Sequence, residues 1–113
     1  MKKAKKTLEE INRYLKKLRK KTPTQTRGFY NLLFSIETGK ALDKKTKELI
    51  AIALSIITHC EWCIVFHVNE AIKAGAKEEE ILESIWMAVL MGGGPALMYG
   101  QLALKAFEEL KKG

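Results

Sequence analysis

The feature that most restricts the fold is the segment 84–104, which contains no charged residue. A segment of this length and composition is sufficient to cross a membrane as one helix. Its middle, however, is Gly92, Gly93, Gly94 and Pro95, an order typical of one helix ending and the next beginning. We therefore predict two buried helix segments on either side of these residues, and no membrane span.

The remaining chain also indicates helices. Ala, Leu, Ile, Lys and Glu dominate and only two prolines are present, which favours helix. The run 49–57 is apolar at nearly every position, but no second strand candidate exists to pair with it. We predict an all-α fold in which this run is central and fully covered, with Glu48 at the edge of the interior. Apolar spacing places the helices at about 5–21, 29–36, 43–57, 61–74, 78–90 and 95–110.

The size of the chain and the breadth of its apolar faces bear on assembly. A length of 113 residues corresponds to one compact multi-helix domain, 1–113, whose residues 1–21 form a basic helix. The last two predicted helices carry more apolar surface than a small monomer can easily cover. Broad exposed apolar faces usually mark subunit contacts, so we expect a homo-oligomer.

The formal net charge of +7 is concentrated in residues 1–21. A basic segment of this kind can bind nucleic acid or an anionic membrane. No interleaved pattern of aromatic residues suggests base stacking, and Glu9 and Glu10 interrupt the run. We therefore favour a solvated helix face and keep nucleic-acid binding as an alternative. No apolar segment follows the basic start as in a secretory signal, which predicts a cytoplasmic location.

The reactive side chains gather between residues 48 and 67. Cys60 and Cys63 form C-x-x-C, and His67 follows Cys63 by four residues. On a helix these spacings put side chains on one face, where two thiols can close a small disulfide loop and an imidazole can take a thiol proton. If Cys63 lies in the first turn of the helix 61–74, the helix N-terminus also favours its thiolate.

Two other interpretations of the cysteines stay open. They can be small apolar core residues, because buried free cysteine is ordinary. Alternatively Cys60, Cys63, His67 and His59 supply the four ligands of a zinc site. His59 is adjacent to Cys60, however, and structural zinc sites usually bring a second pair from elsewhere in the chain, which this sequence lacks. A zinc ion shared between subunits is a further alternative.

The order of these residues resembles a known signature. Glu48, eleven further residues and then Cys60-x-x-Cys63-x-x-x-His67 resemble the alkylhydroperoxidase D group of the carboxymuconolactone decarboxylase superfamily. The flanking segments KTKELIAIALS and AGAKEEEILESIWMAVLMGGGPAL resemble it too, so the likeness covers about residues 23–107.

This resemblance implies an all-α fold in dimers, trimers or hexamers, and a role for each site residue. Cys63 would attack a hydroperoxide and become a sulfenic acid, and Cys60 would resolve it to a disulfide. His67 and Glu48 would form the proton relay. Trp62 stands where the best-studied type of relative has a histidine.

The resemblance also implies the partners. No bound cofactor would be needed, and an external dithiol donor such as a lipoyl or thioredoxin-like protein would reduce the disulfide. A general disulfide reductase using the same residues is the alternative. Decarboxylase members lack the cysteine pair, so that activity is not expected here.

Overall fold

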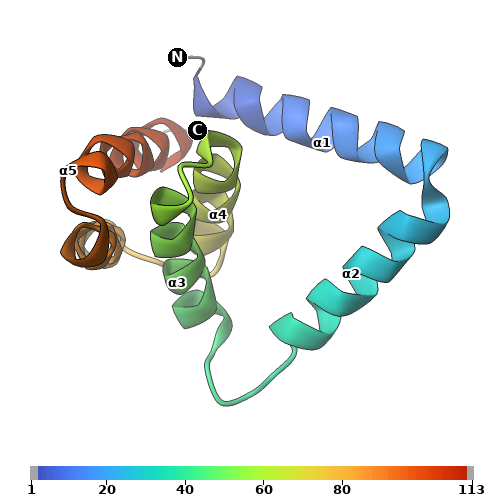
Figure 1. Cartoon of the computed structure of the whole chain (residues 1–113), viewed down its shortest axis with the longest axis horizontal. Coiled ribbons are helices and arrows are strands. Elements are labelled where there is room, and N and C mark those ends of the chain that lie inside the picture. Colours follow the sequence, from blue (N-terminus) through green and yellow to red (C-terminus); the bar gives the residue numbers. More distant parts are fainter. Residues whose placement is uncertain (1–2, 112–113) are drawn as a thin grey trace.

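The computed structural model describes residues 3–111, which form α-helices and no strand. The predicted all-α fold is confirmed. The helices are α1 (Ala4–Lys21), α2 (Pro23–Glu37), α3 (Lys44–Ile57), α4 (Glu61–Lys73) and α5 (Glu78–Lys111). In Figure 1, α3 and α4 lie side by side with α5 on one side, while α1 and α2 form a V-shaped arm on the other. The predicted domain 1–113 includes residues 1–2 and 112–113, which lie outside the described part.

Local sequence signals set several helix ends. Asp43 caps α3, because its carboxylate accepts a hydrogen bond of 2.8 Å from the backbone amide of Thr46. Pro23 occupies the start of α2, where its fixed φ and missing amide hydrogen suit the helix. This helix therefore begins earlier than the predicted range 29–36.

The break in α5 lies where the glycines predict it. Gly93 has φ 65° and ψ −145°, outside the helical region. The part of α5 after the break packs against the part before it, because a Cβ atom on Gly100 would lie 2.7 Å from the side chain of Ile85. By length and composition alone α5 passes as a membrane span, but the break divides it into the two predicted segments. Their burial is only partial, since Leu90 is 71% exposed.

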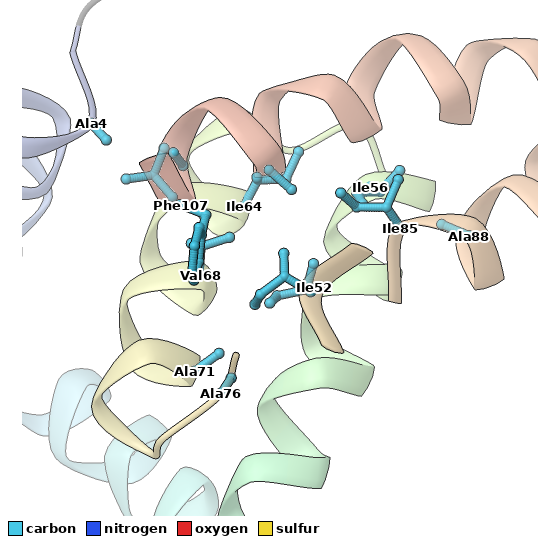
Figure 2. Packing of buried hydrophobic residues seen from close by; sticks show 14 of the residues in the cluster. Ala4, Ile52, Ile56, Ile64, Val68, Ala71, Ala76, Ile85, Ala88 and Phe107 are labelled. Carbon is cyan, nitrogen blue, oxygen red and sulfur yellow. The ribbon is translucent and has the colours of Figure 1, made fainter. Parts of the chain in front are cut away.

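The core is formed where α3, α4 and both parts of α5 meet (Figure 2). Ile52 and Ile56 of α3 lie against Ile64 and Val68 of α4, and all four are fully buried. The prediction that the run 49–57 is fully covered is wrong, because its outer face stays partly exposed in the described chain. The large apolar residues exposed on that face are Ile50, Leu54 and Ile57.

The arm formed by α1 and α2 extends away from this core (Figure 1). No residue of α2 is buried. The far end of α2 is fastened by Lys47 of α3, whose ammonium donates to the carbonyls of Ile36 at 3.0 Å and Gly39 at 2.8 Å. The start of α1 is fastened to α5, since the amide of Ala4 donates to the Glu109 carboxylate at 2.8 Å. The arm is therefore held at both ends and stands opposite α4.

Candidate functional site

The two cysteines lie at the junction of α3 and α4. Cys60 is the N-cap residue of α4, and its sulfur accepts a hydrogen bond of 3.2 Å from the backbone amide of Cys63. Cys63 lies in the first turn of α4, as the sequence indicated, where the helix N-terminus stabilises negative charge. A disulfide joins the two, with their Cα atoms 5.2 Å apart. Cys60 itself is not helical, so the pair spans the cap rather than one helix face.

Glu48 and His67 are brought together from neighbouring helices. The Nδ1 atom of His67 on α4 lies 2.7 Å from a carboxylate oxygen of Glu48 on α3. A carboxylate accepts hydrogen bonds, so Nδ1 carries the hydrogen and Nε2 of the neutral ring is free to act as a base. Glu48 is only 5% exposed, and its carboxylate also has the ammonium of Lys44 at 4.0 Å. The buried negative charge of Glu48 thus has a hydrogen-bond donor in His67 and a cation in Lys44. Both offset the cost of removing the carboxylate from water.

A cleft lies between α4 and the arm. Its cavity volume is about 790 Å³, and both Cys63 and His67 line it. Most of its other lining residues are apolar or aromatic, and α2 contributes more of these than α4 does. From α1 and α2 these are Ile11, Leu15, Phe29, Tyr30, Leu33 and Phe34, and from α4 they are Trp62 and Phe66. The cysteine expected to react and the base expected to serve it therefore face one apolar space.

The sequence did not reveal the outer wall of this cleft. Phe29, Tyr30, Leu33 and Phe34 follow a helical spacing in which two adjacent pairs are one turn apart. That spacing identifies a helix face, but not the helix across from it. Lys44 was also missed as a neighbour of the Glu48 carboxylate, although its position four residues earlier on α3 puts it within reach.

The four side chains proposed as zinc ligands do not converge. Cys60 and Cys63 are joined to each other, and the ring of His59 stacks on Tyr99 of α5. Within residues 3–111 no group of three or more histidine, cysteine or acidic side chains is arranged to hold a metal ion. The arrangement gives the zinc interpretation no support.

The fold and the site together define a class: an α-helical dithiol protein with a cysteine pair at a helix N-terminus beside a buried Glu–His pair. The model of the carboxymuconolactone decarboxylase family matches residues 23–108. The chain belongs to that family.

Solved structures of similar proteins agree in fold. A carboxymuconolactone decarboxylase family protein from Legionella pneumophila superposes with a TM-score of 0.91 at 47% identity, over 95% of this chain and 96% of that one. A family member from Thermotoga maritima with a suggested part in an antioxidative response has a TM-score of 0.82 at 31% identity, over 95% and 91%.

Two curated relatives match over shorter stretches. An uncharacterised protein of the cox locus of Paracoccus denitrificans is 46% identical over 70 residues, which cover 62% of this chain and 63% of that protein. The alkyl hydroperoxide reductase AhpD of Coxiella burnetii is 38% identical over 63 residues, covering 56% of this chain and 36% of that protein. The chain thus spans less than two thirds of the length of either relative.

Proposed function

We propose that this protein reduces hydroperoxides through a redox cycle of Cys60 and Cys63. The observation that carries the proposal is that Cys63, at the N-terminus of α4, and His67, held by Glu48, line the same apolar cleft. The similarity to an alkyl hydroperoxide reductase supports the same chemistry.

Each site residue has a definite part in the cycle. The thiolate of Cys63 attacks one peroxide oxygen, the O–O bond breaks, and the departing oxygen takes a proton supplied through His67 to leave as an alcohol. Cys63 is then a sulfenic acid. The Cys60 thiol attacks that sulfur, water leaves, and the disulfide forms. Glu48 keeps the ring of His67 oriented and balances its charge when the ring is protonated.

The cycle needs two electrons from outside the protein. A dithiol donor exchanges with the Cys60–Cys63 disulfide through a mixed disulfide, and the donor leaves as a disulfide itself. A lipoyl or thioredoxin-like protein has this chemistry. No bound cofactor is required, because the two sulfur atoms hold the electrons. We propose the cytoplasm as the location, where such donors are kept reduced.

We also propose that the protein works as a homo-oligomer. Most of its exposed large apolar side chains lie on two surfaces, one on α2 and one shared by α3 and α5. On α5 the exposed large apolar residues are Trp86, Met87, Leu90, Met91 and Met98. A monomer rarely leaves such surfaces uncovered. Light scattering on the purified protein, read as a molar mass, tests this part of the proposal against the monomer mass of 12.8 kDa.

The test of the reaction uses reduced protein and an organic hydroperoxide, with dithiothreitol as the donor. We expect Cys63→Ser to abolish peroxide consumption. In the absence of dithiothreitol, Cys60→Ser should complete one attack and stop at a sulfenic acid, which dimedone traps and intact mass detects. Peroxide consumption that persists unchanged in Cys63→Ser would overturn the proposal.

The same experiment distinguishes a peroxidase from a general disulfide reductase that uses the same residues. A general disulfide reductase would reduce a small disulfide such as hydroxyethyl disulfide rapidly, while its thiols survived a stoichiometric pulse of hydroperoxide. Loss of both thiols within seconds of the pulse would support the peroxidase instead.

A further inference from the structure

The turn before Cys60 is an unusual version of a common helix ending. At the end of α3 the amide of His59 donates to the carbonyl of Ile56, and the amide of Cys60 donates to the carbonyl of Ser55, each at 3.1 Å. This pair of hydrogen bonds is the Schellman motif, whose left-handed position is usually glycine. His59 occupies that position here, with φ 55°.

The end of α4 shows the usual solution in the same molecule. There Gly75 holds the left-handed position with φ 92°, and the amides of Gly75 and Ala76 make the equivalent bonds of 3.0 and 2.9 Å. Among residues 3–111, His59 is the one non-glycine residue with positive φ. A residue with a side chain is strained in this backbone region relative to glycine. A favourable contact of the His59 imidazole would offset that strain.

The imidazole contacts the second part of α5. Its ring lies parallel to the ring of Tyr99, with centroids 4.5 Å apart and an angle of 5° between the planes. The stack thus connects His59, the residue directly before Cys60, to α5. His59 is bonded to Cys60 through one peptide link, so a fixed His59 restricts the backbone of Cys60, which lies at φ −106° and ψ 97°.

We propose that the His59–Tyr99 stack is a positioning device for Cys60, which keeps its sulfur within reach of Cys63 when the disulfide is open. The proposal rests on the redox cycle of the cysteine pair. Once the disulfide is reduced, Cys60 is held by the Schellman bonds, by the cap bond, by the hydrogen bond from the Ile64 amide to its carbonyl and by this stack. The stack therefore raises the effective concentration of one thiol at the other. His59 and Tyr99 are positioning residues and take no proton or electron in the reaction.

The test measures the equilibrium between protein dithiol plus glutathione disulfide and protein disulfide plus two glutathione molecules. Thiols are trapped with acid and counted by mass in buffers of graded glutathione ratio. We expect His59→Gly to lower this equilibrium constant about threefold to tenfold, in line with the contribution of one aromatic pair. Glycine also relieves the backbone at this position, so the variant should fold.

Matched variants separate positioning from general stability. Tyr99→Leu should lower the constant by a similar factor, and the double variant should be no lower than either single variant, because both remove one contact. Tyr99→Phe keeps a ring and should match the unmodified protein. His59→Asn tolerates the left-handed region without a stacking ring and should match His59→Gly. The proposal is overturned if the equilibrium constant stays unchanged in both His59→Gly and Tyr99→Leu. It is also overturned if the factor measured for the double variant is the product of the two single factors.

A second readout uses the peroxide reaction. A displaced Cys60 resolves the sulfenic acid slowly, so excess hydroperoxide should convert more Cys63 to sulfinic acid in His59→Gly, a gain of about 32 Da. The glutathione equilibrium involves no peroxide. If the unmodified protein fails to consume hydroperoxide, the proposed function is lost while the glutathione constants still decide the role of the stack.

Discussion

Replacing Glu48 by glutamine tests the proton relay most directly. The substitution keeps the size of the side chain and removes the negative charge that faces His67. The neutral amide stabilises a protonated imidazole less well, so His67 becomes a poorer acceptor for the proton of Cys63. We expect slower attack on the hydroperoxide, with little change in the shape of the cleft.

The magnitude follows from the geometry of the contact. The nitrogen–oxygen distance of 2.7 Å is at the short end for charge-assisted hydrogen bonds, which contribute roughly 1.5–3 kcal/mol. The side chain of His67 is 30% exposed while that of Glu48 is 6% exposed, so solvent weakens the contact and the lower figure applies. About 1.5 kcal/mol corresponds to a loss of about tenfold in rate. Removing the base itself by His67→Ala should cost about a hundredfold or more.

The assay is stopped-flow fluorescence of the reduced protein mixed with cumene hydroperoxide at pH 7, followed as single-turnover oxidation. Glu37→Gln is the matched control, because Glu37 lines the same cleft but makes no hydrogen bond or ion pair with His67. It should oxidise at the rate of the unmodified protein. A Glu48→Gln variant that is folded by circular dichroism and oxidises as fast as this control would refute the relay.

The remaining predictions concern the cleft, a helix cap and the core. Phe34→Ala should raise KM for cumene hydroperoxide several-fold and leave the rate with hydrogen peroxide unchanged, because only the bulky substrate reaches the apolar wall; steady-state kinetics with both substrates checks this. The hydrogen bond from the Thr46 amide lowers the pKa of Asp43 below its ordinary value of 3.8, so the cap stabilises the fold fully above pH 3.8 and loses this effect as the pH falls below the folded-state pKa. The difference in melting temperature between the unmodified protein and Asp43→Ala should therefore be present at pH 6 and shrink towards pH 2, as calorimetry would measure. Gly100→Ala should destabilise the protein by about 1–3 kcal/mol in urea unfolding, because the new methyl group would press on Ile85.

Three results would contradict these expectations. Equal effects of Phe34→Ala on both peroxides would mean that the arm supports the fold and not substrate binding. If the difference in melting temperature between the unmodified protein and Asp43→Ala does not change with pH, the charged Asp43 cap is not the cause of that difference. For Gly100, the comparison is Gly28→Ala, where nothing lies within 4 Å of the new Cβ atom, and alanine should stabilise α2. Similar urea midpoints for the two alanine variants would refute close packing at residue 100.

Much of the fold could be predicted because it depends on local chemistry. The cap at Asp43, the helix start after Cys60 and the break at Gly93 each follow from residues within one or two turns. The run 49–57 was misjudged for a physical reason. Uniformly apolar sequence shows that a surface avoids water, but not whether this chain or another molecule covers it, and Leu54 is 58% exposed here.

The site was predictable only in part. The spacing of Cys60, Cys63 and His67 suggested their chemistry, since they lie within two turns of one another. Glu48 is 19 residues from His67, and no local pattern pairs them; the resemblance to the family did. The cleft wall on α2 depends on the angle between α1 and α2, which meet at Thr22, and no local pattern in the sequence gives that angle.

The way the arm is fastened has a consequence for synthesis. The first helix is anchored to Glu109, 105 residues after Ala4. A ribosome must therefore synthesise α2, α3, α4 and most of α5 before the partner of Ala4 exists. The junction that carries Cys60 and Cys63 is complete much earlier, because α3 and α4 are neighbours in sequence. The cysteine pair and the Lys47 contacts of α2 can therefore form before the hydrogen bond between Ala4 and Glu109 completes the arm.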